Sequence, residues 1–164
     1  MTEHMLEHLA LTLVLGPALA AGTAGRLRVR PWFGLLQFAA LVAVLHVPAV
    51  WDATHADALL WLAADVATVA SALLFWWPAL APASPLGPVG RAGYLMVGMP
   101  VMSVVGVVLD FVDRPLYAGV TLGEQHRAGA LMWGVGSAAA AVIFVVAVWL
   151  SLLREERHAV EAAQ

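Results

Sequence analysis

Every histidine of this chain except His158 falls near one end of an apolar segment, where an imidazole could bind a metal ion. His4 and His8 are spaced i, i+4, so on a helix both rings share one face and could bind the same ion. His46 ends a second apolar segment. The sequence contains no cysteine, which excludes disulfides and thiolate sites and leaves histidine, carboxylate and methionine as ligands. The chemistry that these residues indicate is metal binding without thiolates.

Asp65 is the acidic residue that a membrane would tolerate least. It lies eight residues after Asp57 in an apolar segment, which corresponds to roughly 12 Å of descent along a helix. A carboxylate at such a depth costs several kcal/mol unless it is protonated, paired or ligating a metal. We therefore treat Asp65 as a candidate ligand; a structural bond to a neighbouring helix is the alternative.

Two later segments each carry a helical face of methionine, glycine and polar residues. One consists of Met99, Met102, Gly106, Asp110 and Asp113, and the other of Gln125, Gly129, Met132 and Gly136. The glycines would let neighbouring backbones approach closely. Together with the residues above, the predicted metal ligands are His4, His8, His46, Asp65, Met102 and Asp110. Histidine combined with thioether suits copper best, although zinc or no metal remains an alternative.

The elements that must position these residues are membrane helices. Of the 164 residues, 62% are hydrophobic and 12% charged, about half the charged fraction of a soluble domain. The net charge is −3 and mean hydropathy is +0.86, so no nucleic-acid surface is indicated. Since about 20 apolar residues span a bilayer, we predict an all-α integral membrane protein with five transmembrane helices, at 5–23, 32–51, 57–80, 92–111 and 127–152.

Arginine placement predicts the orientation of this five-helix bundle. The first segment has acidic residues where a signal peptide is basic, so we interpret it as a retained helix with the N-terminus outside. This topology puts six arginines in the cytoplasm and two outside, as the positive-inside rule requires. The histidine-rich ends then face outward, and the C-terminus is cytoplasmic. We expect one transmembrane domain at 1–153, in contact with membrane lipid, and a charged tail at 154–164.

Six short pieces of the chain resemble the CtaG-type assembly factors of caa-type cytochrome c oxidase. The pieces are HMLEH at 4–8, LHVPAVWD at 45–52, LLFWWP at 73–78, PVMS at 100–103, DRPLY at 113–117 and EQHRAGALMW at 124–133. The resemblance implies a multi-pass protein of the bacterial inner membrane that handles copper during maturation of haem-copper oxidases. His4, His8 and His46 match histidines of the family motifs directly, so the resemblance implies that they are metal ligands.

Two features depart from the family pattern. Relatives usually have more helices before the first histidine pair, so we expect a shortened form. Where the family tends to have a His-x-x-Glu-His pattern, this chain has Trp61, Ala64 and Asp65. Asp65 therefore matches the family pattern in position but not in residue type.

These observations support three functions. The first is a non-enzymatic factor that holds or delivers copper at the outer face, with haem-copper oxidase subunits as partners. The second is a metal-free accessory subunit of a respiratory or photosynthetic membrane complex. The third is a haem-b electron carrier with His8 and His46 as axial ligands. Catalysis is not expected, because no nucleophile and base recur at a recognisable spacing.

Overall fold

A computed structural model describes residues 1–23 and 27–162, apart from the side chains of Met102 and of most residues after Val146. The described residues form helices joined by loops and contain no strand. Its elements are α1 (Thr2–Ala10), the π-helical turn η1 (Leu11–Leu15), α2 (Gly16–Gly22), α3 (Pro31–Leu45), α4 (Pro48–Ala56), α5 (Ala58–Leu80), α6 (Pro88–Phe111) and α7 (Leu122–Ala162). Four helical stretches are long and apolar enough to cross a membrane, and five if α3 and α4 form one bent span. The all-α prediction is confirmed, and the chain has the character of a multi-pass membrane protein.

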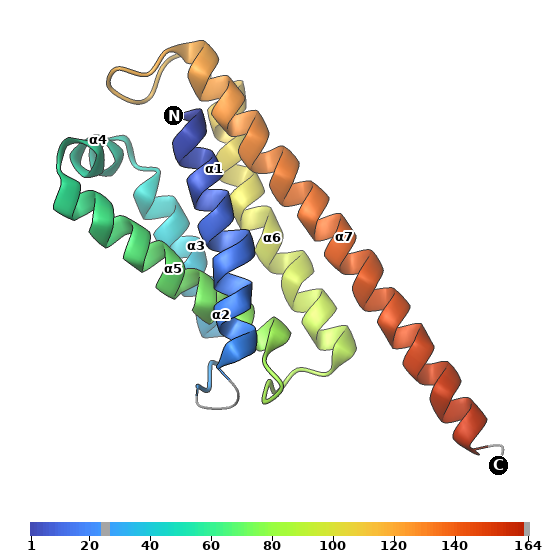
Figure 1. Cartoon of the computed structure of the whole chain (residues 1–164). Coiled ribbons are helices and arrows are strands. Elements are labelled where there is room, and N and C mark those ends of the chain that lie inside the picture. The colour runs from blue at the N-terminus through green and yellow to red at the C-terminus, as the bar shows by residue number, and fades with distance from the viewer. Residues whose placement is uncertain (24–26, 163–164) are drawn as a thin grey trace.

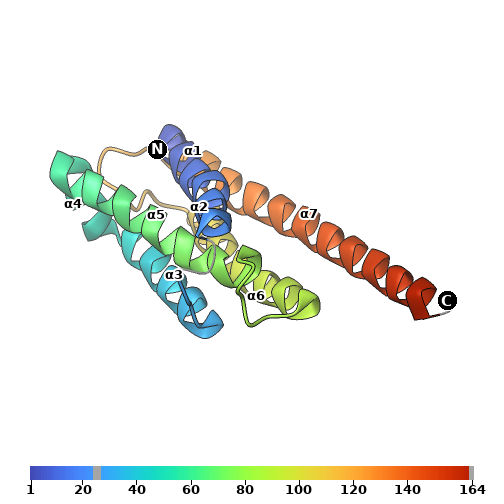
Figure 2. The same ribbon diagram turned by 60° about the horizontal axis from the view of Figure 1, so that its bottom comes forward.

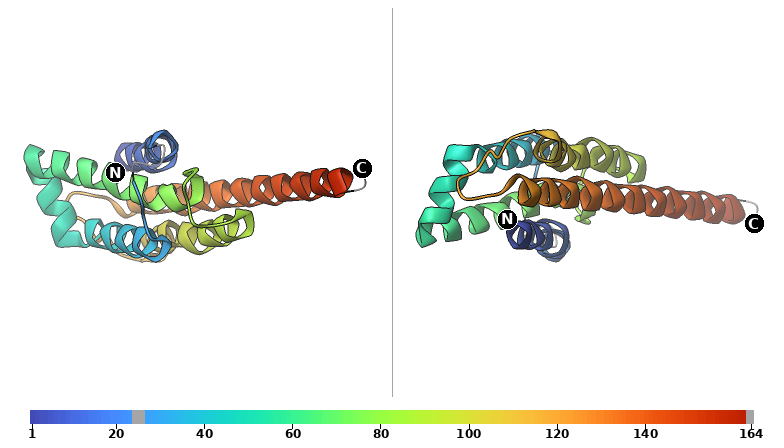
Figure 3. Two further views of the ribbon diagram at one scale, coloured as in Figure 1. Left: turned by 90° about the horizontal axis from the view of Figure 1, so that it is seen from below. Right: turned by 90° about the horizontal axis from the view of Figure 1, so that it is seen from above.

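The helices form a bundle (Figure 1). The N-terminus, α4 and the 112–121 loop lie together at one end, which we call the N-terminal end. α7 runs along α6 and then continues well beyond the bundle (Figures 1 and 2). Its 41 residues correspond to about 60 Å. Viewed along the bundle, α4 bridges the ends of α3 and α5 (Figure 3).

The predicted second helix, 32–51, is wrong in one respect, because it is broken after Leu45. The structure has two helices, α3 and α4, that meet at 74°. Pro48 is the physical reason. It has no N–H to continue the helix, and it restricts Val47 to an extended conformation (φ −67°, ψ 126°). The break turns α4 across the N-terminal end and leaves His46 as the C-cap of α3.

The first span contains a π-helical turn that frees a backbone carbonyl. The N–H of Gly16 donates to the carbonyl of Leu11, five residues back, so the carbonyl of Thr12 loses its usual partner. The indole Nε1 of Trp76 on α5 donates to that carbonyl at 2.6 Å. This bond ties the first span to α5 and fixes how the residues of α1 face the bundle interior.

The starts of the other helices follow their capping residues. Asp57 caps α5, because its Oδ1 accepts from the N–H groups of Leu59 and Leu60. α7 begins five residues earlier than the predicted 127, because Thr121 and Glu124 form a capping box. α6 begins at Pro88 rather than 92, with the proline in its favoured position in the first turn.

Two glycines let α6 and α7 pack backbone against backbone. A Cβ on Gly129 would lie 2.6 Å from the carbonyl oxygen of Gly106 and 2.6 Å from the backbone nitrogen of Asp110. The expected close approach at Gly106 is therefore confirmed. We call this α6–α7 contact the seam.

Candidate metal site

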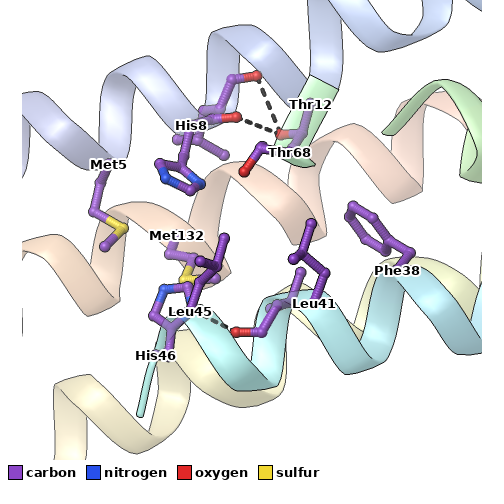
Figure 4. A pocket seen from close by; sticks show the side chains of 11 residues that line it. Met5, His8, Thr12, Phe38, Leu41, Leu45, His46, Thr68 and Met132 are labelled. Carbon is purple, nitrogen blue, oxygen red and sulfur yellow. Dashed lines mark hydrogen bonds between the residues drawn. The ribbon is translucent and has the colours of Figure 1, made fainter. Parts of the chain in front are cut away.

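A small cavity lies inside the bundle toward the N-terminal end, between α1, α3, α5 and α7. Its volume is about 20 Å³, and we call it the chamber. Much of its wall is apolar, formed by Leu9, Phe38, Leu41, Val42 and Leu45. The other lining residues are Met5, His8, Thr12, His46, Thr68 and Met132, most of which are visible in Figure 4. The space accommodates one water-sized group, since a water needs at least about 10–15 Å³.

α1 brings Met5 and His8 to the chamber from one side. The two residues are three apart and share a face of the helix. The hydroxyl of Thr12 donates to the carbonyl of His8 at 2.6 Å, in the turn that Trp76 holds against α5. The backbone that carries His8 is therefore fixed by two hydrogen bonds in series.

His46 faces the chamber from the other side, with its ring oriented by the backbone. Its Nδ1 donates to the carbonyl of Val42 at 2.7 Å. Because a carbonyl can only accept, Nδ1 carries the hydrogen and Nε2 of the neutral ring carries the lone pair. His46 Nε2 is buried and has no hydrogen-bond partner among the described residues. This is the arrangement of a metal-ligating histidine, which usually donates its other N–H to a carbonyl or carboxylate.

Above the chamber, four aromatic side chains form what we call the rim: His4, Trp51, His55 and Trp61. The His4 ring centre lies 4.3 Å from that of His8, 4.6 Å from Trp51 and 5.0 Å from Trp61. His55, which is exposed, stacks on Trp51 with 3.9 Å between ring centres. His4 Nδ1 is a second buried nitrogen without a partner in the part of the chain that is described. The rim thus links a solvent-exposed imidazole to the chamber.

The 112–121 loop holds the rim and the end of α3 together. The hydroxyl of Tyr117 donates to the carbonyl of His46 at 3.1 Å, and its ring packs 4.7 Å from that of Trp51. The N–H of Ala118 donates to Asp52 Oδ1 at 3.1 Å. Burial, and then the negative charge of Asp52, raise the pKa of Tyr117 to about 12, so its hydroxyl remains a donor at neutral pH.

The structure places the two predicted carboxylate ligands on α5 and α6. Asp110 Oδ2 accepts from the indole Nε1 of Trp133 across the seam at 3.0 Å. Asp65 is half-buried on α5, three residues before Thr68. The side chain of Met102 lies outside the described residues. Within the described ranges, no three histidine or acidic side chains converge closely enough to hold a metal ion.

A known family matches most of this chain. The sequence profile described as "Cytochrome c oxidase caa3 assembly factor (Caa3_CtaG)" matches residues 23–154. The chain belongs to this family. Comparison with curated proteins and with solved structures gives no significant match.

The assembly-factor match covers only part of the candidate metal site. His46, the indoles of Trp51 and Trp61, and Met132 lie inside residues 23–154, whereas α1 with His4 and His8 lies before them. The family-like region and α1 therefore complete the chamber together.

Sequence reasoning did not assign two of the chamber residues, Met5 and Met132, as ligands. Met5 is adjacent to His4 in the first helix, and Met132 lies on the glycine-rich face of α7. A methionine on an apolar face is more often a packing residue. Their approach to one cavity depends on how α1 packs against α7, which spacing within a single helix does not report.

Proposed function

We propose that this member of the family is a non-enzymatic assembly factor that holds one copper ion in the chamber and passes it to a haem-copper oxidase subunit. The main support is that His46 lines a cavity together with His8, and that its Nε2 is buried and has no partner in the described part of the chain. A buried polar atom without a partner is destabilising by about 1–3 kcal/mol, so its retention favours a function. The copper ion is cargo, not a permanent part of the fold.

The rim supports the proposal that the copper ion is transferred as well as held. His4 lies between the exposed His55 and the chamber-lining His8, with 4.9 Å and 4.3 Å between ring centres. Successive imidazoles at these separations give an ion a stepwise path between solvent and chamber. Of the other predicted ligands, Asp65 on α5 stays a prediction, because Thr68 one turn later lines the chamber but Asp65 itself does not.

We further propose that the N-terminal end faces the outside of the bacterial cytoplasmic membrane. The arginine distribution supports this orientation, and delivery of copper to an oxidase site outside the cytoplasm requires it.

The haem alternative receives no support from the dimensions of the chamber. His8 and His46 both face the chamber, but pockets for cofactor-sized ligands have volumes of about 300–1,000 Å³. The chamber has about 20 Å³. An absorption spectrum of the purified protein with a Soret band would restore this alternative.

The metal-free accessory subunit remains the second candidate. Its support is Trp61, an indole that packs against His4 and His55 at the position where the family tends to have a ligand. Stable co-purification with a complete oxidase or photosynthetic complex in stoichiometric amount, without copper, would favour this function over delivery.

Metal analysis of the detergent-purified full chain tests the proposal. After anaerobic equilibration with Cu(I) and removal of free metal, we expect stoichiometric copper. The combined His4→Ala, His8→Ala and His46→Ala variant should lose it. His126→Ala is the matched control, because the His126 ring bonds the carbonyl of Val112 and does not line the chamber. Absence of copper in the unmodified protein, or full retention by the triple variant, would overturn the proposal.

A further inference from the structure

We infer that the thioethers of Met5 and Met132 complete the copper site with His8 and His46, and that this ligand set selects Cu(I) over Cu(II) and Zn(II). The inference rests on the proposed function, because it specifies the ligands and the oxidation state of the same site. Neither methionine is among the ligands that the sequence predicts.

The chamber brings the four side chains together from three helical elements. Met5 and His8 come from α1, His46 from the end of α3, and Met132 from α7. In Figure 4 the sulfur atoms of Met5 and Met132 both lie on the chamber side of their helices, and the sulfur of Met132 appears between the two imidazoles. Met5 is 1% and Met132 4% exposed, so both thioethers are removed from solvent.

Among the described residues, no carboxylate lines the chamber, and the two hydroxyl groups that do are engaged. The Thr12 hydroxyl donates to the carbonyl of His8, and that of Thr68 donates to the carbonyl of Ala64 at 2.8 Å. Apart from these hydroxyls, the two imidazoles and the two thioethers, the lining is hydrocarbon. An ion in the chamber is therefore offered two imidazoles and two thioethers, and no charged oxygen ligand.

Such a ligand set discriminates by charge and by softness. Imidazoles and thioethers are all neutral, so the charge of the ion stays uncompensated in an apolar wall. The Born penalty rises with the square of the charge, which makes a divalent ion about four times as costly as a monovalent one. Thioether sulfur is also a soft ligand that favours Cu(I). Both the charge and the softness of the ligands favour Cu(I).

Met99 provides a matched control within the same chain. It is a methionine on α6 with 2% exposure, comparable to Met5 and Met132, but it does not line the chamber. Substitution of methionine by leucine conserves volume and apolar character, so the variants should fold. Any difference in Cu(I) affinity between the chamber variants and Met99→Leu then results from lost ligation rather than from altered packing.

The experiment measures Cu(I) affinity of the detergent-solubilised full chain by competition with a chromophoric Cu(I) chelator. Loss of one group that hydrogen-bonds a metal ligand weakens metal affinity about 10- to 100-fold. Loss of two ligands in the Met5→Leu/Met132→Leu variant should therefore weaken it by about 100-fold or more. Met99→Leu should bind as the unmodified protein does. X-ray absorption of the copper-loaded unmodified protein should show copper–sulfur scattering, and Cu(I) should bind more tightly than Zn(II).

The outcomes separate this inference from the function on which it rests. Tight Cu(I) binding that the double methionine variant retains, or a copper spectrum with nitrogen scattering only, would overturn the inference and leave the copper function standing. Failure of the unmodified protein to bind Cu(I) would overturn both.

Discussion

The seam and the chamber both bury polar side chains inside an apolar bundle, but they differ in whether those side chains have hydrogen-bond partners. Along the seam, Gln125 is 0% exposed, its amide donates to the carbonyls of Leu109 and Arg114, and its Oε1 accepts from the N–H of Leu116. Asp110 likewise accepts from Trp133. In the chamber and rim, His46 Nε2 and His4 Nδ1 have no partner within the described part of the chain.

This difference separates structural polar residues from candidate ligands. Satisfied groups contribute their hydrogen bonds to the fold and have little capacity left for a ligand. Unsatisfied nitrogens that carry a lone pair lower stability until something binds them. A third buried nitrogen without a partner in the described ranges, Trp77 Nε1, does not fit this role, because an indole N–H can only donate.

The largest effect should come from adding one methyl group to the seam. Gly129→Ala places a Cβ 2.6 Å from two backbone atoms of α6, and backbone cannot move aside as a side chain can. We expect a loss of about 3 kcal/mol in the free energy of unfolding, measured by denaturation of the detergent-solubilised protein. Gly134→Ala is the control on the same helix, because a Cβ there meets nothing within 4 Å. Equal stability of the two variants would show that α6 and α7 do not pack through Gly129.

Removal of the seam's buried amide should have the next largest effect. Gln125→Leu keeps the approximate volume but leaves the N–H of Leu116 and two carbonyls without their partner. We expect the free energy of unfolding to fall by about 2 kcal/mol. Copper retention, measured on the folded fraction, should not change. A variant as stable as the unmodified protein would mean that water replaces these bonds, and the contrast between seam and chamber would weaken.

The same kind of substitution in the chamber should cost less. His46→Leu removes a buried Nε2 that has no partner among the described residues, but it also removes the Nδ1–H that donates to the carbonyl of Val42. These effects oppose each other, so the free energy of unfolding should change by less than about 1 kcal/mol. Copper binding should be lost. Loss of binding with little loss of stability is typical of a functional site. A His46→Leu protein that unfolds as easily as Gln125→Leu would instead make His46 a structural residue.

The sequence predicts the helices well and their interruptions poorly. Hydropathy locates the apolar segments because each helix must satisfy its own backbone in lipid. The bend at Pro48 was missed because the apolar composition continues to Trp51, and hydropathy does not register a missing N–H. The early start of α7 was missed for a related reason, since the Thr121–Glu124 capping box lies in a polar stretch that composition assigns to a loop.

The candidate site was predictable within one helix and much less so between helices. The i, i+4 spacing of His4 and His8 indicates a shared face, and their ring centres are 4.3 Å apart. Which residue of α7 faces α1 depends on the rotation of each helix and on the angle at which the two cross. The sequence therefore indicated Met132 on α7 as a ligand no more strongly than Met99 on α6. Trp61, placed where a ligand was expected, packs on His4 and His55 as part of the rim.

The smallest expected effect distinguishes a seam carboxylate from a metal ligand. Asp110→Asn removes the charge but keeps an oxygen that can accept from Trp133 Nε1, at present 3.0 Å from Asp110 Oδ2. Hydrogen bonds between membrane helices contribute about 0.6 kcal/mol on average, so unfolding free energy should change by less than about 1 kcal/mol. Copper content should equal that of the unmodified protein. If Asp110→Asn instead loses copper while its stability holds, the sequence prediction of Asp110 as a ligand is right. The metal site would then extend from the chamber into the seam, and a satisfied hydrogen bond would no longer identify a structural residue in this protein.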